Sequence, residues 1–292
     1  MKITFKYLTV GLAVLGVCQG AHAALIHRYS FATDATDSVG SANGTLVNSA
    51  TVSGGQLQLN NPNFSGPSTA GGYLSLPVSI LPSSGSVTIE QWFTFTGSGF
   101  FTEAYTFSDN HHDTTGPGAS SGQYLMHTIS APQPGSPPGG PNTGGSHIAQ
   151  SLAGYGGGAE TDAFETTPGI GAGGGGYLDN GATFMAATVI DSISGTLSYY
   201  LNGALQQTIP AIPLSSYSFT DAYLGRSAFA GDNSTSGSVD EFRIYNDAHS
   251  AADVATDFAA GPNMVVVPEP GSIALIALAG TGLLLWRRRQ AK

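Results

Sequence analysis

The chain of 292 residues contains one cysteine, Cys18, and very little positive charge. Of its nine lysines and arginines, only Arg28, Arg226 and Arg243 lie between residues 24 and 264, whereas all but one of its 19 aspartates and glutamates lie there. A surface this acidic repels nucleic acid and anionic lipid, and it favours solubility and cation binding. Nucleic acid is therefore excluded as a partner. Disulfides are excluded too, once the segment that holds Cys18 is removed.

Residues 1–23 have the three parts of a secretory signal peptide. Two lysines come first, an apolar run follows over residues 8–17, and the small-x-small sequence AHA ends the segment. This order predicts a signal helix that is removed by cleavage before Ala24. Cys18 leaves a lipoprotein as an alternative, but Val17 stands where a small residue is wanted before a lipidated cysteine.

A second apolar segment, residues 271–286, lies close to the C-terminus and carries no charge. At about 1.5 Å per residue, a helix of this length spans about 24 Å, against a hydrocarbon core of about 30 Å. We therefore expect a short transmembrane helix, which begins after two prolines that cannot continue it backwards. Arg287, Arg288 and Arg289 follow it and should stay on the cytoplasmic side by the positive-inside rule.

Pro268, Glu269 and Pro270 stand immediately before this apolar segment. The triplet, the short helix and the basic cluster, in that order over residues 265–292, resemble the PEP-CTERM sorting signal of Gram-negative bacteria. The resemblance implies transient anchoring in the inner membrane and cutting at or near the triplet by a membrane protease, an exosortase. It also implies a final location at the cell surface or in the extracellular matrix. The alternative is a plain C-terminal membrane anchor.

Between the two ends, the pattern of the chain is that of an all-β protein. Short runs that alternate, or that are rich in β-branched and aromatic residues, are separated by clusters of Gly, Ser, Asn and Pro that mark turns. Nine such runs are LIHRYSF, GQLQLN, GYLSLP, SVTIEQWFTF, GQYLMHTIS, TFMAATVID, GTLSYYLNG, DAYLGRS and GSVDEFRIYN. Because each sheet must bury one face, this many short strands predict a sandwich or a barrel.

One stretch, SAADVATDFAA, has a helical pattern instead. Ser250 is expected to cap this helix, with Asp253 at the third helical position completing a capping box. Val254 and Phe258 would then form a small apolar face. The sequence therefore predicts one short helix directly after the last strand.

The predicted strands also resemble a known family. The segments that are similar, in chain order, are HRYSFATDATDSVGSANGTL, SVTIEQWFTF, GTLSYYLNG and AYLGRSAFAGDNSTSGSVDEFRIYNDAHSAADV. They resemble LamG-like jellyroll domains of the concanavalin A-like lectin and glucanase superfamily over most of residues 26–258. The resemblance implies a two-sheet jellyroll sandwich over residues 24–262. Residues 183–185, Thr-Phe-Met, depart from a Trp-His pair frequent in the family, and the Gly/Pro-rich stretches around residues 110–180 are expected to be loops.

Catalysis of the usual kind is not expected from this sequence. Retaining glycosidases of the superfamily carry Glu-x-Asp-x-Glu or a close variant, which places the working carboxylates on one face, about 5 Å apart. No such string occurs in the chain. Two residues after Glu90, where a second carboxylate would stand, the chain has Trp92. Asp240 and Glu241 are adjacent, so a regular strand points them to opposite faces. The protein is predicted not to be an enzyme, with a lyase or an unusual active site as the alternative.

Calcium is the expected ligand of the acidic domain, because hard cations bind carboxylates, Asn side chains and the carbonyls of turns. Jellyrolls similar to this one often hold a calcium ion between the opening loop and the Asp-Glu strand. By position, the resemblance implies Asp240 as one ligand, with Asp37 or the carbonyls of residues 38–43 nearby. The alternative is that Asp240 only hydrogen-bonds a neighbouring turn.

Three further features are interpreted as structural. The His-His-Asp sequence at residues 111–113 has no third ligand placed by spacing, so solvated side chains are expected there. Tyr199 and Tyr200 straddle the two faces of a strand, so one should lie in the core, while the other could be exposed and serve as a sugar platform. Arg226 and Arg243 are expected to form ion pairs.

Together, these features predict an exported, exosortase-processed protein of the cell surface or matrix. Its jellyroll domain is expected to bind carbohydrate, such as exopolysaccharide or an envelope glycan, or another envelope component, with calcium as a stabilising ion. Two alternatives remain open because fold alone does not decide function. One is a polysaccharide-active enzyme on the same fold, and the other is a purely structural matrix protein.

Overall fold

The computed structural model describes the part of the chain between the two predicted targeting segments. Ala23–Val266 forms one compact unit. The described ranges are 24–61, 68–96, 101–109, 122–130, 145–154, 160–166 and 178–265. No helix within these ranges is long and apolar enough to cross a membrane. The signal helix, the predicted transmembrane helix, the sorting triplet and the His-His-Asp sequence lie outside them.

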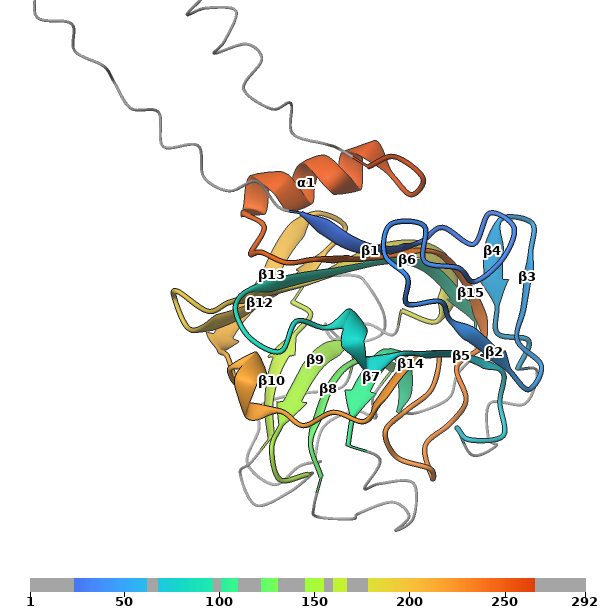
Figure 1. The fold of residues 1–292 in the computed structure, drawn as a ribbon, viewed down its shortest axis with the longest axis horizontal. Helices are drawn as coiled ribbons and strands as arrows, with labels where there is room; N and C mark the ends of the chain where they lie inside the picture. The colour runs from blue at the N-terminus through green and yellow to red at the C-terminus, as the bar shows by residue number, and fades with distance from the viewer. Residues whose placement is uncertain are drawn as a thin grey trace, which may run out of the picture. The chain divides into compact units, whose positions relative to one another are not determined.

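Two antiparallel sheets pack face to face (Figure 1). In the eight-stranded sheet, β1 (Leu25–Tyr29) pairs with β15, off the main path of the sheet. From edge to edge, that path is β13 (Ala204–Pro210), β12 (Thr196–Leu201), β11 (Asn180–Asp191), β6 (Val87–Thr96), β15 (Gly237–Tyr245), β4 (Gln56–Gln58) and β3 (Thr51–Ser53).

The seven-stranded sheet covers the other side of the core. Its order is β10 (Glu160–Phe164), β9 (His147–Ser151), β8 (Tyr124–Ser130), β7 (Thr102–Ser108), β14 (Asp221–Leu224), β5 (Tyr73–Leu76) and β2 (Thr45–Val47). Two short 3-10 turns, η1 (Val78–Ile80) and η2 (Leu214–Ser216), lie in connections. The predicted fold class, an all-β sandwich of two sheets, is confirmed.

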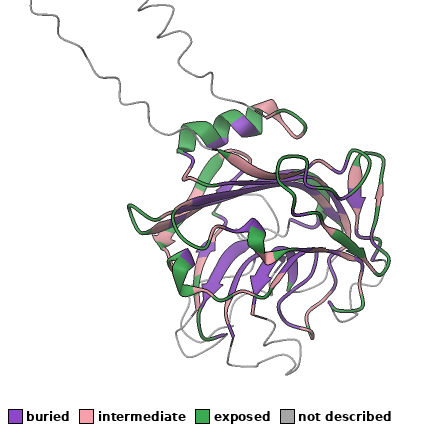
Figure 2. Ribbon diagram, in the orientation of Figure 1, coloured by how far each residue is buried: buried purple, intermediate pink, exposed green. Residues whose placement is uncertain are grey.

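Aromatic side chains fill the space between the sheets. Phe93 and Phe95 of β6 stack with ring centroids 4.5 Å apart, and Tyr105 of β7 meets Phe242 of β15 across the sandwich at 6.1 Å. Figure 2 shows that the facing sides of both sheets are buried. Burial of each large apolar side chain contributes on the order of 1.5–3 kcal/mol, so this core accounts for the pairing of the sheets.

The helix α1 (Ala251–Ala260) packs on the outer face of the eight-stranded sheet (Figure 1). The side chains of Ser250 and Asp253 each accept a hydrogen bond from the other's backbone N–H, so the predicted capping box is confirmed. Val254 is buried, as predicted, in a cluster that includes Trp92. The prediction for Phe258 is wrong: this ring is 41% exposed, and the helix buries Asp257 instead.

The last described residues remain on the same outer face. The backbone N–H of Asn263 donates to Glu241 over 2.6 Å, and the Arg243 guanidinium donates to the carbonyl of Met264 over 2.8 Å. Arg243 faces outward, since its guanidinium lies 4.5 Å from the centre of the Trp92 ring beneath α1. The described chain therefore ends on the outer side of the eight-stranded sheet.

The nine predicted strand segments all contain strands, namely β1, β4, β5, β6, β8, β11, β12, β14 and β15. The interpretation of residues 110–180 as loops is wrong in part. Besides β8, this region contains β9 and β10, which extend the seven-stranded sheet to its edge. These two strands position the candidate site.

Candidate functional site

The outer face of β8, β9 and β10 carries polar and aromatic side chains in register. Leu125, Ile148 and Ala163 of these strands face the core, so the residues on either side of each face outward. The outer side chains form three rows across the strands: Tyr124, Ser151 and Glu160; Met126, Ala149 and Asp162; and Thr128, His147 and Phe164. We call these nine residues the β8–β10 outer face.

Two carboxyl groups stand on this face, two residues apart on β10. The Tyr124 hydroxyl donates a hydrogen bond to Glu160, and Oδ1 of Asp162 is buried without a hydrogen-bond partner. Burial raises the pKa of both carboxyl groups, and the charge of Asp162 raises the pKa of Glu160 further. Both carboxyl groups are therefore protonated more readily than exposed ones, and a protonated carboxyl group can donate a hydrogen bond as well as accept one.

An imidazole and a phenyl ring complete the face. The rings of His147 and Phe164 lie with centroids 5.2 Å apart. Burial lowers the pKa of His147, so its ring is uncharged at neutral pH and offers one donor and one acceptor. Phe164 is partly exposed. An apolar ring beside several hydroxyl-binding groups is the combination that a sugar ring requires, because its C–H face packs on an aromatic surface.

The loop of residues 225–236, between β14 and β15, packs against the same outer face. Phe229 contacts Tyr124 edge to face, with ring centroids 5.6 Å apart. The Ser227 hydroxyl donates to Asp232 over 2.5 Å. Burial raises the pKa of Asp232 to about 7, and burial together with the charge of Asp232 raises the pKa of Glu103 well above its ordinary value. Asp232 of the loop and Glu103 of β7 thus form a second pair of carboxyl groups whose raised pKa values favour the protonated form.

Arg226 belongs to this loop and was expected in an ion pair. Its guanidinium lies 4.3 Å from the centre of the Tyr223 ring and 5.0 Å from that of Tyr73, and it donates to the Tyr73 hydroxyl over 3.3 Å. Cation–π contacts of this kind contribute about 0.5–2 kcal/mol. Arg226 therefore holds the loop against the strands β5 and β14.

Asp37, proposed as a calcium ligand, lies in the loop after β1 and is surrounded by donors. Its Oδ2 lies 2.6 Å from Nδ1 of His27. Burial alone would raise the pKa of Asp37, but these hydrogen bonds outweigh it and hold the pKa at about 2. The backbone N–H groups that donate to its carboxylate are those of Arg28, Val39, Gly40 and Ala42.

Asp240, the other proposed calcium ligand, lies in β15. Its Oδ1 accepts a hydrogen bond from Gln56 of β4 over 2.6 Å, and its Oδ2 is buried without a hydrogen-bond partner. No hydrogen bond or ion pair between the described residues joins it to Asp37. Calcium binding by these two residues stays a prediction.

The expectation that Asp240 and Glu241 point to opposite faces is wrong. A register shift lies between Val239 and Glu241, opposite β6. A bulge of this kind interrupts the alternation of side chains, so both carboxylates lie on the outer side of the sheet. Glu241 pairs there with Arg28 and with Arg243, each over 2.6 Å, which confirms the ion pair expected for Arg243.

Neither adjacent tyrosine is an exposed platform. Tyr199 is fully buried between the sheets, where its hydroxyl lies 2.8 Å from the Ser146 hydroxyl oxygen. Tyr200 points to the outer face, but it is only 6% exposed because it lies in the cluster beneath α1. The prediction that one of the two could be exposed is wrong because the helix covers this side of the strand.

The residues of the β8–β10 outer face were not found by sequence reasoning. The search for three alternating carboxylates passed over residues 160–164, Glu-Thr-Asp-Ala-Phe, because the third position holds Phe164. The usable signal was the spacing of Glu160 and Asp162, which places two carboxyl groups on one face of a strand. The segments on either side of these residues are rich in glycine and proline, which favours a loop, so the strand was not predicted.

Comparisons with known structures agree with this fold. Domain 4 of AbnA, a GH43 extracellular arabinanase from Geobacillus stearothermophilus, in complex with arabinotriose, is similar with a TM-score of 0.55 and 18% identity, covering 80% of this chain and 98% of that one. The binding domain of botulinum neurotoxin DC, in complex with rat synaptotagmin II, is similar with a TM-score of 0.52 and 15% identity, covering 80% of this chain and 51% of that one.

A third structure comes from botulinum neurotoxin type C, whose cell entry is described as dependent upon interaction with two ganglioside molecules. Its TM-score is 0.51 at 14% identity, covering 81% of this chain and 50% of that one. This protein thus spans about half the length of the toxin chains it matches. At these identities, the likeness shows the fold alone. No curated protein matches the chain.

Family models match both parts of the chain. Residues 67–255 match the Laminin_G_3 model of the concanavalin A-like lectin/glucanases superfamily. Residues 266–289 match the PEP-CTERM protein-sorting motif, which indicates export with a membrane-anchored sorting signal. The chain therefore belongs to the concanavalin A-like lectin/glucanase superfamily and carries a PEP-CTERM sorting motif at its C-terminal end.

Proposed function

We propose that this protein is exported, processed by an exosortase at or near Pro268, Glu269 and Pro270, and retained at the cell surface or in the extracellular matrix. There, its jellyroll domain binds a glycan, either exopolysaccharide or an envelope polysaccharide, without cutting it. Calcium bound at Asp37 and Asp240 stabilises the domain in this proposal.

The observation that supports glycan binding is the composition of the β8–β10 outer face. Glu160 and Asp162 place partly exposed hydrogen-bonding groups in adjacent rows, with Tyr124 and His147 buried beside them, and Phe164 adds a partly exposed apolar ring. Because burial favours the neutral forms of the carboxyl groups, they match uncharged sugar hydroxyls. A similar jellyroll has been determined with arabinotriose bound, so this fold accommodates an oligosaccharide in at least one other protein.

A polysaccharide-cleaving enzyme is the second candidate, and the same two carboxyl groups favour it. Glu160 and Asp162 lie on one face of β10, and a raised pKa is what a catalytic acid needs. The position of the third carboxylate in Glu-x-Asp-x-Glu is occupied by Phe164. A phenyl ring cannot donate or accept the proton, and this substitution is our reason for preferring binding over cleavage.

The test uses the purified segment 24–264 and exopolysaccharide extracted from the producing cells. Binding is measured with calcium and with chelator, and the chain length of the polymer is measured afterwards. The variants Glu160→Ala and Asp162→Ala remove the hydrogen-bonding groups, and each should weaken binding about tenfold through lost hydrogen bonds to the ligand. Asp191→Ala, at the end of β11, is the matched control and should bind as the wild type does.

Binding that the two variants weaken, with the polymer left intact, supports the proposal. Shortened polymer favours the enzyme, particularly if both variants abolish shortening. Absence of binding to any extracted polymer overturns glycan binding and leaves a structural role. Equal binding with calcium and with chelator removes calcium from the proposal while leaving the glycan.

A further inference from the structure

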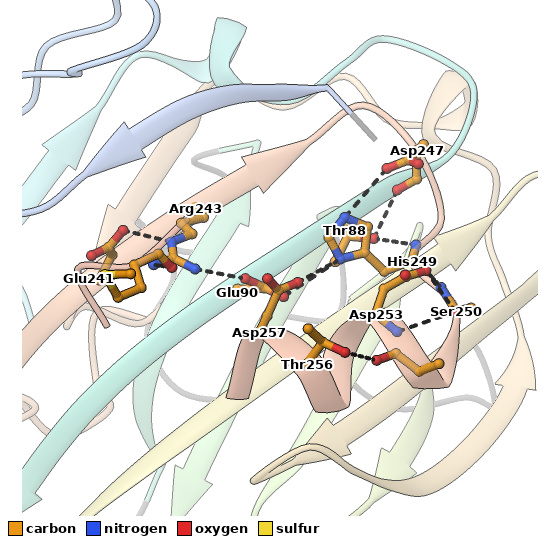
Figure 3. Close-up of polar contacts among 12 residues, drawn as sticks. Thr88, Glu90, Glu241, Arg243, Asp247, His249, Ser250, Asp253, Thr256 and Asp257 are labelled. Carbon is orange, nitrogen blue, oxygen red and sulfur yellow. Dashed lines mark hydrogen bonds and ion pairs between the residues drawn. The ribbon is translucent and has the colours of Figure 1, made fainter. Parts of the chain in front are cut away.

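Three ionisable side chains converge beneath α1, on the side of the sandwich opposite to the β8–β10 outer face. Glu90 comes from β6, His249 from the turn after β15, and Asp257 from α1 (Figure 3). We call these three residues the α1 cluster. One ligand atom from each lies within 4.8 Å of the other two, and all three residues are buried. Nothing in the proposed function uses them.

The distances within the α1 cluster match those between ligands of one small metal ion. Nδ1 of His249 lies 3.3 Å from Oδ2 of Asp257 and 3.7 Å from Oε1 of Glu90. Ligand atoms at about 2.0–2.2 Å from a tetrahedral Zn²⁺ are separated by about 3.3–3.6 Å. A small movement of the three side chains toward one another would therefore place their ligand atoms at three of the four coordination positions of the ion.

The hydrogen bonding of the cluster is incomplete in a way that favours a bound cation. Both carboxylate oxygens of Glu90 and both ring nitrogens of His249 are buried without a hydrogen-bond partner. Glu90 is fully buried, and His249 is 7% exposed. Burial of such groups without a hydrogen-bond partner is unfavourable, and more so for a charged group. Figure 3 shows that Glu90 and Asp257 point at the same edge of the His249 ring.

The surroundings supply the outer contacts that a metal-bound histidine usually has. Nε2 of His249, the nitrogen turned away from the cluster, lies 3.7 Å from Oδ1 of Asp247. At this distance the two atoms form no hydrogen bond, but a small shift would let Asp247 accept from Nε2–H, which is the contact that leaves Nδ1 free for a metal. On the far side, Nη1 of Arg243 lies 3.7 Å from Oε2 of Glu90, so Arg243 engages one oxygen and leaves Oε1 facing the cluster.

Charge balance also favours a divalent cation. The connected network contains two guanidinium groups, those of Arg28 and Arg243. Against them stand the four carboxylates of Glu90, Glu241, Asp247 and Asp257. Three of the four carboxylates are buried, and buried charge is costly unless it is paired, so the network needs further positive charge, which either a protonated His249 or a bound cation supplies. One divalent ion with a neutral imidazole balances the network.

We propose that the α1 cluster is a binding site for a divalent transition metal ion, with Zn²⁺ as the best match. Oε1 of Glu90, Nδ1 of His249 and Oδ2 of Asp257 are its protein ligands, and water takes the fourth position. An imidazole ligand separates this site from calcium sites, which use oxygen ligands. The ion would clamp α1 to the eight-stranded sheet immediately before the sorting motif, and the proposal is independent of glycan binding.

The test measures zinc bound to the full-length chain in detergent. The protein is stripped with a chelator, dialysed and titrated with Zn²⁺ by calorimetry, and its zinc content is then determined by elemental analysis. We expect one tightly bound Zn²⁺ per chain and a higher unfolding temperature in its presence. Asp257→Asn should weaken this binding at least tenfold, whereas the matched control Asp191→Asn should bind as the wild type does.

A wild-type chain that binds no stoichiometric Zn²⁺ overturns the proposal and leaves a protonated His249 as the cation between the two carboxylates. Equal zinc binding by Asp257→Asn and the wild type also overturns it, since the ion must then lie elsewhere. If Asp257→Asn fails to fold, as judged by circular dichroism, Glu90→Gln takes its place. Displacement of bound Zn²⁺ by an equal concentration of Ca²⁺ would contradict the assigned metal class.

Discussion

At the scale of single residues, the buried carboxyl groups fall into two kinds. Burial opposes the ionised form of Asp37 and Glu241, but donors surround both carboxylates and lower their pKa. Glu103 and Asp232 have fewer donors, and burial raises their pKa. The first kind stabilises the fold at neutral pH, whereas the second kind costs stability there. The two kinds therefore give opposite pH dependences.

Asp232 provides a test of the second kind. Its pKa is about 7 in the folded protein against 3.8 for an ordinary aspartate, so the stability present at low pH is lost as the pH rises from about 4 through 7. Asp232→Asn keeps an oxygen that accepts from the Ser227 hydroxyl but cannot ionise. Its free energy of unfolding should therefore fall less between pH 5 and pH 8 than that of the wild type, as measured by urea denaturation at each pH.

Asp191→Asn is the control for this comparison. Hydrogen bonds from the Ser194 side chain lower the pKa of Asp191, so its titration ends below the pH range of the experiment. This variant should follow the wild type across the range. If Asp232→Asn also follows the wild type, Asp232 is ionised throughout and the burial argument for it is wrong.

At the scale of the element, strands rich in β-branched and aromatic residues were the predictable ones, even where both faces are buried, as in β6 and β8. β9 and β10 were missed because each is only five residues long and both lie among Gly/Pro-rich stretches, so neither pattern nor composition distinguishes them from loops. The β15 bulge was equally hidden, since one extra residue leaves no mark in the sequence.

The helix shows the same limit. Its start was predictable from Ser250 and Asp253, because capping depends on residues within one turn. The burial of Asp257 was not, because Asp257 faces inward only in the company of Glu90 and His249, which come from other elements. Any pattern that considers one element at a time predicts that an aspartate or glutamate side chain is exposed to solvent. The candidate metal site was therefore out of reach of sequence reasoning.

The capping box predicts the effect of a change at one end of α1. Ser250→Ala removes the side chain that accepts from the backbone N–H of Asp253, and it should lower the free energy of unfolding by about 0.5–2 kcal/mol in urea denaturation. Thr256→Ala is the control, because the Thr256 hydroxyl only donates back to the carbonyl of Ala252 within the helix. Equal effects of the two variants would show that the cap does not stabilise the helix.

At the scale of the whole molecule, the described unit is strongly acidic. It has three arginines and no lysine, against the large majority of the 19 carboxylates of the chain. Net charge of this size destabilises a compact state through self-repulsion, and salt screens that repulsion. The unit should therefore gain stability from salt rather than lose it.

This expectation is tested by thermal unfolding at pH 7 in increasing sodium chloride. The unfolding temperature should rise between about 10 mM and about 150 mM salt, over which the screening length falls from about 30 Å to about 8 Å. The same series at pH 4, where many carboxyl groups are protonated, is the control and should show a smaller rise. A fall at pH 7 would mean that ion pairs such as that of Arg28 with Glu241 outweigh the repulsion.

The last described residues and the β8–β10 outer face lie on opposite sides of the sandwich. Asn263 and Met264 are bound to the outer side of the eight-stranded sheet, whereas the β8–β10 outer face belongs to the seven-stranded sheet. A ligand on the β8–β10 outer face would therefore leave the contacts of Asn263 and Met264 untouched, so the two sides of the sandwich can be occupied at the same time.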